Sequence, residues 1–219
     1  MLKRSSLLAA VAISAVTLPS VGYAAPVIDL ITPGGEYSGA PFSLGFEFST
    51  DTAQAIDALG VYDNLGDGLT NAAQIGLWSM NGTLLTSATI GAGTGTLNGL
   101  FRYVSISPFA LTPGTRYIVG AYSRDFASSL GTSQGGTGNI NPLVTIFKDR
   151  YTEGSSLSFP SFTDNHTGGA WLGANFNLVS IASAVPEPSS WAMMIIGFGA
   201  IGAALRRRQN VTRRVTFAT

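Results

Sequence analysis

The sequence feature that most constrains the fold is an alternation of large apolar residues with small or polar ones. Phe42, Leu44, Phe46 and Phe48 alternate with two serines, a glycine and Glu47. Successive side chains of a β-strand point to opposite faces, so this pattern predicts a half-buried strand. We expect the Phe46 face to point into a core and Glu47 to point outward.

The same short periodicity continues along the middle of the chain. An Asn81-Gly82 pair between two apolar runs predicts a hairpin. Residues 127–141 are polar and predict a loop, and no long amphipathic helix is visible. Many short strands with glycine-rich turns indicate an all-β fold, an antiparallel, jelly-roll-like β-sandwich over residues 25–181. The other β-like runs are 56–62, 73–79, 83–90, 100–107, 116–123, 143–148 and 172–181.

The start of the chain predicts export. Lys3 and Arg4 precede an apolar stretch at 7–18, and small residues with a proline follow at 19–24. These are the three parts of a secretory signal peptide, which predicts residues 1–24 as the peptide and cleavage after Ala24. An N-terminal core helix is the alternative. Because the chain contains no cysteine, an exported domain must be stabilised by its core rather than by disulfides.

The other end of the chain predicts a membrane helix. A Pro/Ser linker at 182–190 is followed by an apolar run at 191–205 and then by three arginines in a basic tail at 206–219. Arginines after an apolar run stay with the cytoplasmic leaflet, so the run predicts a single transmembrane helix with the tail in the cytoplasm. At about 1.5 Å per residue it is short for a hydrocarbon core of about 30 Å. Trp191 at the interface and arginine snorkelling would cover the deficit.

This terminal segment resembles the PEP-CTERM sorting signal of Gram-negative bacteria, in the variant with Trp-Ala after the proline motif. The resemblance implies export, transient anchoring in the inner membrane, and cleavage near the motif by an exosortase. The signal peptide makes the Sec translocon the expected export partner. It also implies a final place at the cell surface or in a matrix of exopolysaccharide and biofilm. The tail after the arginines is longer than the family's usual ending. The residues that carry the match include Pro186, Glu187, Pro188, Trp191, Arg206, Arg207 and Arg208.

A second resemblance covers the middle of the chain. Residues from about 42 to 122 are similar to a domain of unknown function, expected to be a β-sandwich, that recurs in bacterial surface proteins. Among the segments that carry it are Phe46-Glu47-Phe48, Ile75-Gly76-Leu77-Trp78 and Leu111-Thr112-Pro113-Gly114. The resemblance implies a fold and no activity.

The charges are unevenly distributed. Formal net charge is zero, yet residues 25–185 hold eleven acidic and five basic side chains, a net of −6. An acidic exported domain argues against nucleic acid as a partner. It is compatible with divalent cations or a neutral polysaccharide.

The candidates for chemistry are few. The single histidine, His166, lies in a polar segment without a nucleophile motif, and its simplest interpretation is a surface loop residue. Carboxylates suited to a glycosidase show no pair spacing; they are Glu36, Glu47, Asp57 and Glu153. We therefore expect no enzyme activity.

Two binding hypotheses remain. Asp63, Asn64 and Asp67 place oxygen donors on one tight loop, as Ca²⁺ requires, although the same residues also build ordinary turns. No other cofactor is predicted. Trp78 and Trp171 would form a carbohydrate platform if their rings were exposed, with Tyr62, Tyr103 and Tyr122 as further candidates. The alternative is that a tryptophan on an alternating strand belongs to the core.

Together these patterns predict an exported cell-surface or matrix protein with a structural or interaction role. The alternatives are a carbohydrate-binding module that engages exopolysaccharide and, third, a hydrolase.

Overall fold

The computed structural model describes residues 24–34, 41–124, 136–163, 171–181 and 188–211. Within the last range, side chains are described for 192–206. The chain divides into two compact units between Ile181 and Ala182. The first unit is the β-domain, and the second contains the helix.

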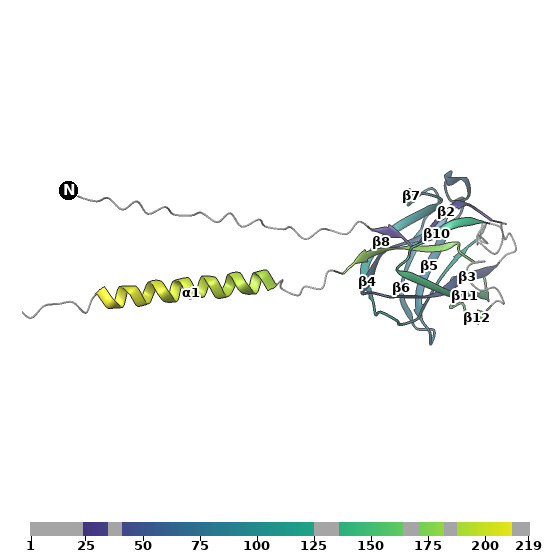
Figure 1. The fold of residues 1–219 in the computed structure, drawn as a ribbon. Helices are drawn as coiled ribbons and strands as arrows, with labels where there is room; N and C mark the ends of the chain where they lie inside the picture. Colours follow the sequence, from purple (N-terminus) through teal and green to yellow (C-terminus); the bar gives the residue numbers. More distant parts are fainter. Residues whose placement is uncertain (1–23, 35–40, 125–135, 164–170, 182–187, 212–219) are drawn as a thin grey trace, which may run out of the picture. The chain divides into compact units, whose positions relative to one another are not determined.

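The β-domain consists of antiparallel sheets (Figure 1). The five-stranded sheet has the order β1-β13-β4-β8-β7, the six-stranded sheet the order β12-β11-β3-β9-β5-β6, and β10 pairs with β2. The expected antiparallel sandwich class agrees with this architecture, and the jelly-roll-like connectivity stays a prediction. The strands are β1 (Ala25–Pro26), β2 (Ile28–Thr32), β3 (Phe42–Thr50), β4 (Gln54–Tyr62), β5 (Ala73–Ser79), β6 (Leu84–Ile90), β7 (Thr96–Asn98), β8 (Phe101–Leu111), β9 (Tyr117–Ser123), β10 (Thr137–Ile140), β11 (Val144–Glu153), β12 (Phe162–Thr163) and β13 (Ala174–Ser180).

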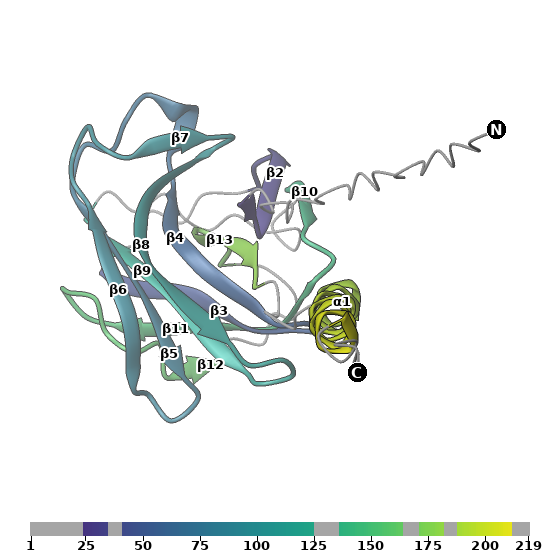
Figure 2. The ribbon, with the colours of Figure 1, turned by 90° about the vertical axis from the view of Figure 1, so that its left-hand side faces the viewer.

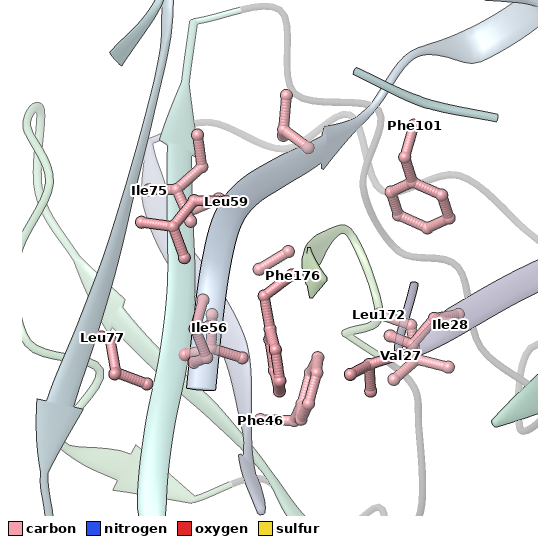
Figure 3. Close-up of a cluster of buried hydrophobic side chains, with 14 of the residues drawn as sticks. Val27, Ile28, Phe46, Ile56, Leu59, Ile75, Leu77, Phe101, Leu172 and Phe176 are labelled. Atoms are coloured by element: carbon pink, nitrogen blue, oxygen red, sulfur yellow. The ribbon is translucent and has the colours of Figure 1, made fainter. Parts of the chain in front are cut away.

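The main core lies between the two large sheets. Phe46 and Phe48 of β3 are fully buried, and the Phe48 ring centroid lies 4.6 Å from that of Phe176 on β13. Figure 3 shows Phe46 and Phe176 beside Ile56 in this cluster. The predicted inward face of β3 is therefore confirmed. Phe42, at the start of the strand, is half-buried and packs against the core.

Part of the outer face of the five-stranded sheet is covered by the β2-β10 ribbon. Asn175 on β13 is fully buried, and its side-chain amide pairs with the backbone of Ile28. The Asn175 Oδ1 accepts from the Ile28 N–H at 3.2 Å, and its Nδ2 donates to the Ile28 carbonyl at 2.8 Å. Figure 2 shows β2 and β10 side by side. This pairing fixes the ribbon on the sheet.

A segment at 154–161, here named the cover segment, lies against the outer face of the six-stranded sheet. The Ser158 N–H donates to the Ser43 hydroxyl at 3.0 Å, and the Leu157 N–H donates to the Gln74 side chain at 3.4 Å. Ser43 on β3 is therefore buried, and Glu47 on the same face is buried where it pairs with Arg116 and Arg150. The prediction that β3 is only half-buried is wrong, because the chain covers both of its faces.

Local sequence signals located eight strands but missed five. The Asn81-Gly82 hairpin is confirmed: β5 pairs with β6, and Gly82 has the positive φ of 87° that its turn needs. β8 and β11 continue beyond their predicted ends. Residues 137–140 form β10 instead of a loop, because they pair with β2 across more than a hundred residues of sequence. The missed strands are β1, β2, β7, β10 and β12.

The second unit contains one described helix, α1 (Pro188–Val211). It begins three residues before the predicted Trp191, so Pro188 does not stay outside the helix as expected. Proline fits the first helical turn, where its missing N–H has no partner to lose. The helix also runs past Leu205 into the predicted tail. In the described part of the chain, no helix is long and apolar enough to cross a membrane. The predicted transmembrane span is thus not confirmed.

Candidate functional site

The described residues of the sorting motif lie on α1. Pro188 begins the helix, Trp191 lies in its first turns, and Arg206 to Arg208 lie near its end. Its described side chains, at 192–206, are exposed, among them Ile195 at 70% and Phe198 at 69%. Pro186 and Glu187 lie outside the described residues, as do residues 1–23 of the predicted signal peptide and His166. Ala24, the predicted cleavage position, is described and exposed.

The most prominent charged cluster of the β-domain is centred on Glu47. Glu47 is only 1% exposed, and its carboxylate accepts from Arg150 on β11 and from Arg116, which immediately precedes β9. Arg116 Nη1 lies 2.8 Å from Oε1, and Arg150 Nη2 lies 2.5 Å from Oε2. The Arg116 guanidinium also lies 3.9 Å from the centre of the Phe147 ring. The two guanidinium groups compensate the negative charge of Glu47, and each of its carboxylate oxygens accepts a hydrogen bond.

The predicted aromatic platform fails at Trp78. Its side chain lies on the outer face of β5, where the cover segment buries it to 4% exposure. The Phe159 ring centroid lies 6.3 Å from it. Trp171 is half-buried and packs against the core. A sugar platform needs exposed ring faces, so Trp78 does not form one; its face is occupied by the chain itself, in agreement with the alternative that this tryptophan is buried.

The loop proposed for Ca²⁺ is organised around an ion pair. Asp63 is 2% exposed, and Arg102 Nε lies 2.5 Å from its Oδ2. The Gly68 N–H donates to the same oxygen at 3.1 Å. Arg102 Nη2 also donates to the carbonyl of Gly66 at 3.0 Å, so one guanidinium holds both the carboxylate and the loop backbone. Asn64 accepts from the hydroxyl of Tyr62 at 3.1 Å.

These contacts make the loop an Arg102-centred turn. It lines a hollow of about 240 Å³, with Asp67 exposed at its wall. The described residues contain no group of three or more histidine, cysteine, aspartate or glutamate side chains placed to hold a metal. Calcium occupancy stays a hypothesis, which a comparison of melting temperatures in millimolar Ca²⁺ and in chelator would decide.

Two ionisable groups of the five-stranded sheet have shifted pKa values. Burial raises the pKa of the Tyr103 hydroxyl above its usual range, and the charge of Asp29 on β2 adds to the effect. Burial also raises the pKa of Asp57, an effect that a backbone hydrogen bond partly opposes. Asp57 lies where the register of β4 shifts against both β13 and β8. Asp57 and Glu47 are on different sheets, so the structure does not pair them as glycosidase carboxylates.

Comparison with known families assigns both parts of the chain. Residues 32–171 match the family described as Domain of unknown function (DUF4082). The chain belongs to the DUF4082 family. Residues 184–208 match the PEP-CTERM protein-sorting motif, which confirms the predicted sorting signal. Neither the curated proteins nor the solved structures contain a match to the chain.

The DUF4082 match extends further than the predicted resemblance at 42–122. It contains the Glu47 cluster, the Arg102 turn and the cover segment, whereas β13 lies beyond it. The three paired arginines were not predicted as site residues from the sequence. A usable signal was their scarcity, because Arg102, Arg116 and Arg150 are three of only five basic residues in the acidic region 25–185. In such a background, a basic residue on a strand indicates a buried acidic partner.

Proposed function

We propose that the β-domain is a structural or interaction component of the cell surface or extracellular matrix, and that it is not an enzyme. The PEP-CTERM motif marks an exosortase-sorted protein that is exported and reaches the cell surface by way of the membrane. The proposal adds what the β-domain does after sorting. It also adds the setting, which is the exopolysaccharide-rich biofilm of a Gram-negative host.

The observation that carries the proposal is how the chain uses two of its buried carboxylates, Glu47 and Asp63. Glu47 accepts from Arg116 and Arg150, and Asp63 accepts from Arg102. A carboxylate that serves as a general acid, general base or nucleophile must reach a substrate, and its pKa must suit that role. Glu47 and Asp63 are buried and paired with guanidinium groups, so they instead contribute to the positioning of strands and loops.

The covered sheets support the same conclusion. Carbohydrate-binding sandwiches need an accessible surface with exposed rings, but here the cover segment occupies the Trp78 face. The β2-β10 ribbon occupies part of the other outer face through Asn175. Recognition by this domain is therefore expected at its edges, at its loops or at the uncovered part of the five-stranded sheet.

Fractionation of the native host tests this function. A tagged chain should accumulate in the matrix fraction, and a strain lacking it should form a matrix that disperses at lower shear. The control is a chain with Pro186, Glu187 and Pro188 replaced by alanine, which should remain with the membrane and not restore cohesion.

An activity assay on the same material separates the classes. Exported protein incubated with purified matrix polysaccharide should release no reducing ends above the background of a heat-unfolded sample. Release of reducing ends above that background would refute the structural role. So would a strain lacking the chain whose matrix disperses at the same shear as that of the wild type.

A further inference from the structure

The six-stranded sheet ends in an open strand. β6 is its last strand and pairs only with β5, in the register Gln74↔Thr89 and Ile75↔Ala88. A strand at the edge of a sheet presents a row of unused backbone N–H and C=O groups on its free side. Seven residues long, β6 is the longest strand at an end of the described sheets.

The other ends of the two large sheets are protected. β1 and β12 are two residues long and β7 is three, too short to accept a long partner strand. The part of β8 that extends past its pairing with β7 contains Pro108, at a register shift with β4. Proline has no N–H to donate to a further strand, and the register shift bends β8. These are devices by which natural proteins prevent edge pairing.

β6 carries neither a charge nor a proline. Its sequence is Leu-Leu-Thr-Ser-Ala-Thr-Ile, and no charged residue occurs between Asp67 and Arg102. A register shift near Leu85 disturbs its first residues, but 86–90 pair regularly with β5. Ser87 and Thr89 are exposed. The β6 edge therefore lacks the features that prevent edge pairing at the other sheet ends, namely a very short strand or a proline at a register shift.

We propose that β6 is an assembly edge that pairs antiparallel with β6 of a second copy of this chain. Two identical strands that pair antiparallel are related by a two-fold axis, which closes the contact as a dimer. Each copy then donates and accepts backbone hydrogen bonds along residues 86–90, and the two six-stranded sheets become continuous.

A second copy fits this edge better than a charged partner. The region 25–185 carries a net charge of −6, so two copies repel each other over most of their surface. The uncharged stretch between Asp67 and Arg102 is where that repulsion is smallest. A basic or acidic partner would find no opposite charge on β6 to recognise. The inference deepens the proposed structural role by naming a partner, but it requires only that the folded chain be present.

Charge substitutions at Ser87 test the pairing. Sedimentation velocity of the exported protein, purified from its host, should show a concentration-dependent dimer. Ser87→Lys and Ser87→Glu should each weaken the dimer by at least about tenfold, because the two-fold axis places each new charge in the interface twice. Ser180→Lys is the matched control, since Ser180 is exposed on β13 of the other sheet, and it should leave the dimer unchanged.

Mixing the two variants removes the ambiguity of a folding defect. Ser87→Lys and Ser87→Glu combined should form a mixed dimer, because opposite charges face each other across the axis. A monomeric wild type, variants that dimerise like the wild type, or a mixture that stays monomeric would overturn the proposal. The matrix fractionation is independent of this result. A monomeric protein that still accumulates in the matrix would refute the pairing through β6 without refuting the proposed function.

Discussion

Pro160 of the cover segment lies so close to Gly120 on β9 that a Cβ at Gly120 would be 2.7 Å from the proline Cγ. Gly120 is paired in register with Gly45 and Gly76 on the neighbouring strands. Three glycines in a row across the sheet leave a shallow trough on its outer face. The cover segment and the Trp78 ring fill that trough, which is why this face is unavailable to a ligand.

The Gly120 contact predicts a measurable coupling. Gly120→Ala should cost about 1–3 kcal/mol of unfolding free energy, because the new methyl group overpacks against the proline ring. Pro160→Ala should relieve most of that cost, so the double variant should be more stable than the sum of the single effects. Denaturant unfolding measures all four proteins. Gly91→Ala is the control, since its nearest contact is the flexible Thr94 side chain at 3.2 Å. Additive effects would show that Pro160 does not rest on Gly120.

The Glu47 cluster predicts a large loss of folding stability when the charge of Glu47 is removed by substitution. Glu47→Gln should destabilise the fold by about 3–5 kcal/mol, because it leaves the mostly buried Arg150 guanidinium uncompensated. Glu153→Gln, at an exposed position, should change stability by less than about 0.5 kcal/mol.

The two arginines of the cluster should differ. Arg150 is 13% exposed and Arg116 is 51% exposed, so Arg150→Met should cost more than Arg116→Met. Equal costs would mean that burial does not set the strength of these pairs.

The position of the core predicts that alanine substitution at two phenylalanines differs in its cost to folding stability. Phe46→Ala removes a fully buried ring and should cost about 3–5 kcal/mol in chemical unfolding. Phe162→Ala removes a ring that is 58% exposed and should cost far less. A loss below about 1 kcal/mol at Phe46 would place that residue outside the core.

Asp57 predicts a pH dependence of stability. Its pKa is raised in the folded state, so the folded protein binds a proton more readily than the unfolded chain. Its contribution to stability is therefore most favourable at low pH and is lost as the pH rises through the folded pKa. Asp57→Asn should stabilise the protein at neutral pH, and the gain should vanish near pH 3, where the carboxyl is protonated in both states. An equal gain at both pH values would assign the effect to packing.

Short-range signals predicted much of this fold. The alternation in β3 and the Asn81-Gly82 turn act over a few residues, and both gave the observed structure. β2 and β10 were missed because neither stabilises itself locally; each exists through pairing with the other, for example Ile28 with Ile140. The cover segment has no periodicity at all. It buries Trp78, whereas Glu47, predicted to point outward, is buried where it pairs with Arg116 and Arg150.

The sorting signal was predictable because it is read locally, as a motif with fixed spacing. The arginine partners were not, since Glu47 and Arg150 lie 103 residues apart and meet only through the register of β3 with β11. Sequence periodicity identifies which face a residue occupies. It does not identify what covers that face.

Intact mass spectrometry of the exported protein, purified from the native host, tests the central claim most directly. An exosortase substrate should end near residues 186–190, next to the Pro-Glu-Pro motif, and the variant with Pro186, Glu187 and Pro188 replaced by alanine should stay uncleaved with the membrane. Exported protein that still ends at Thr219 would contradict exosortase sorting.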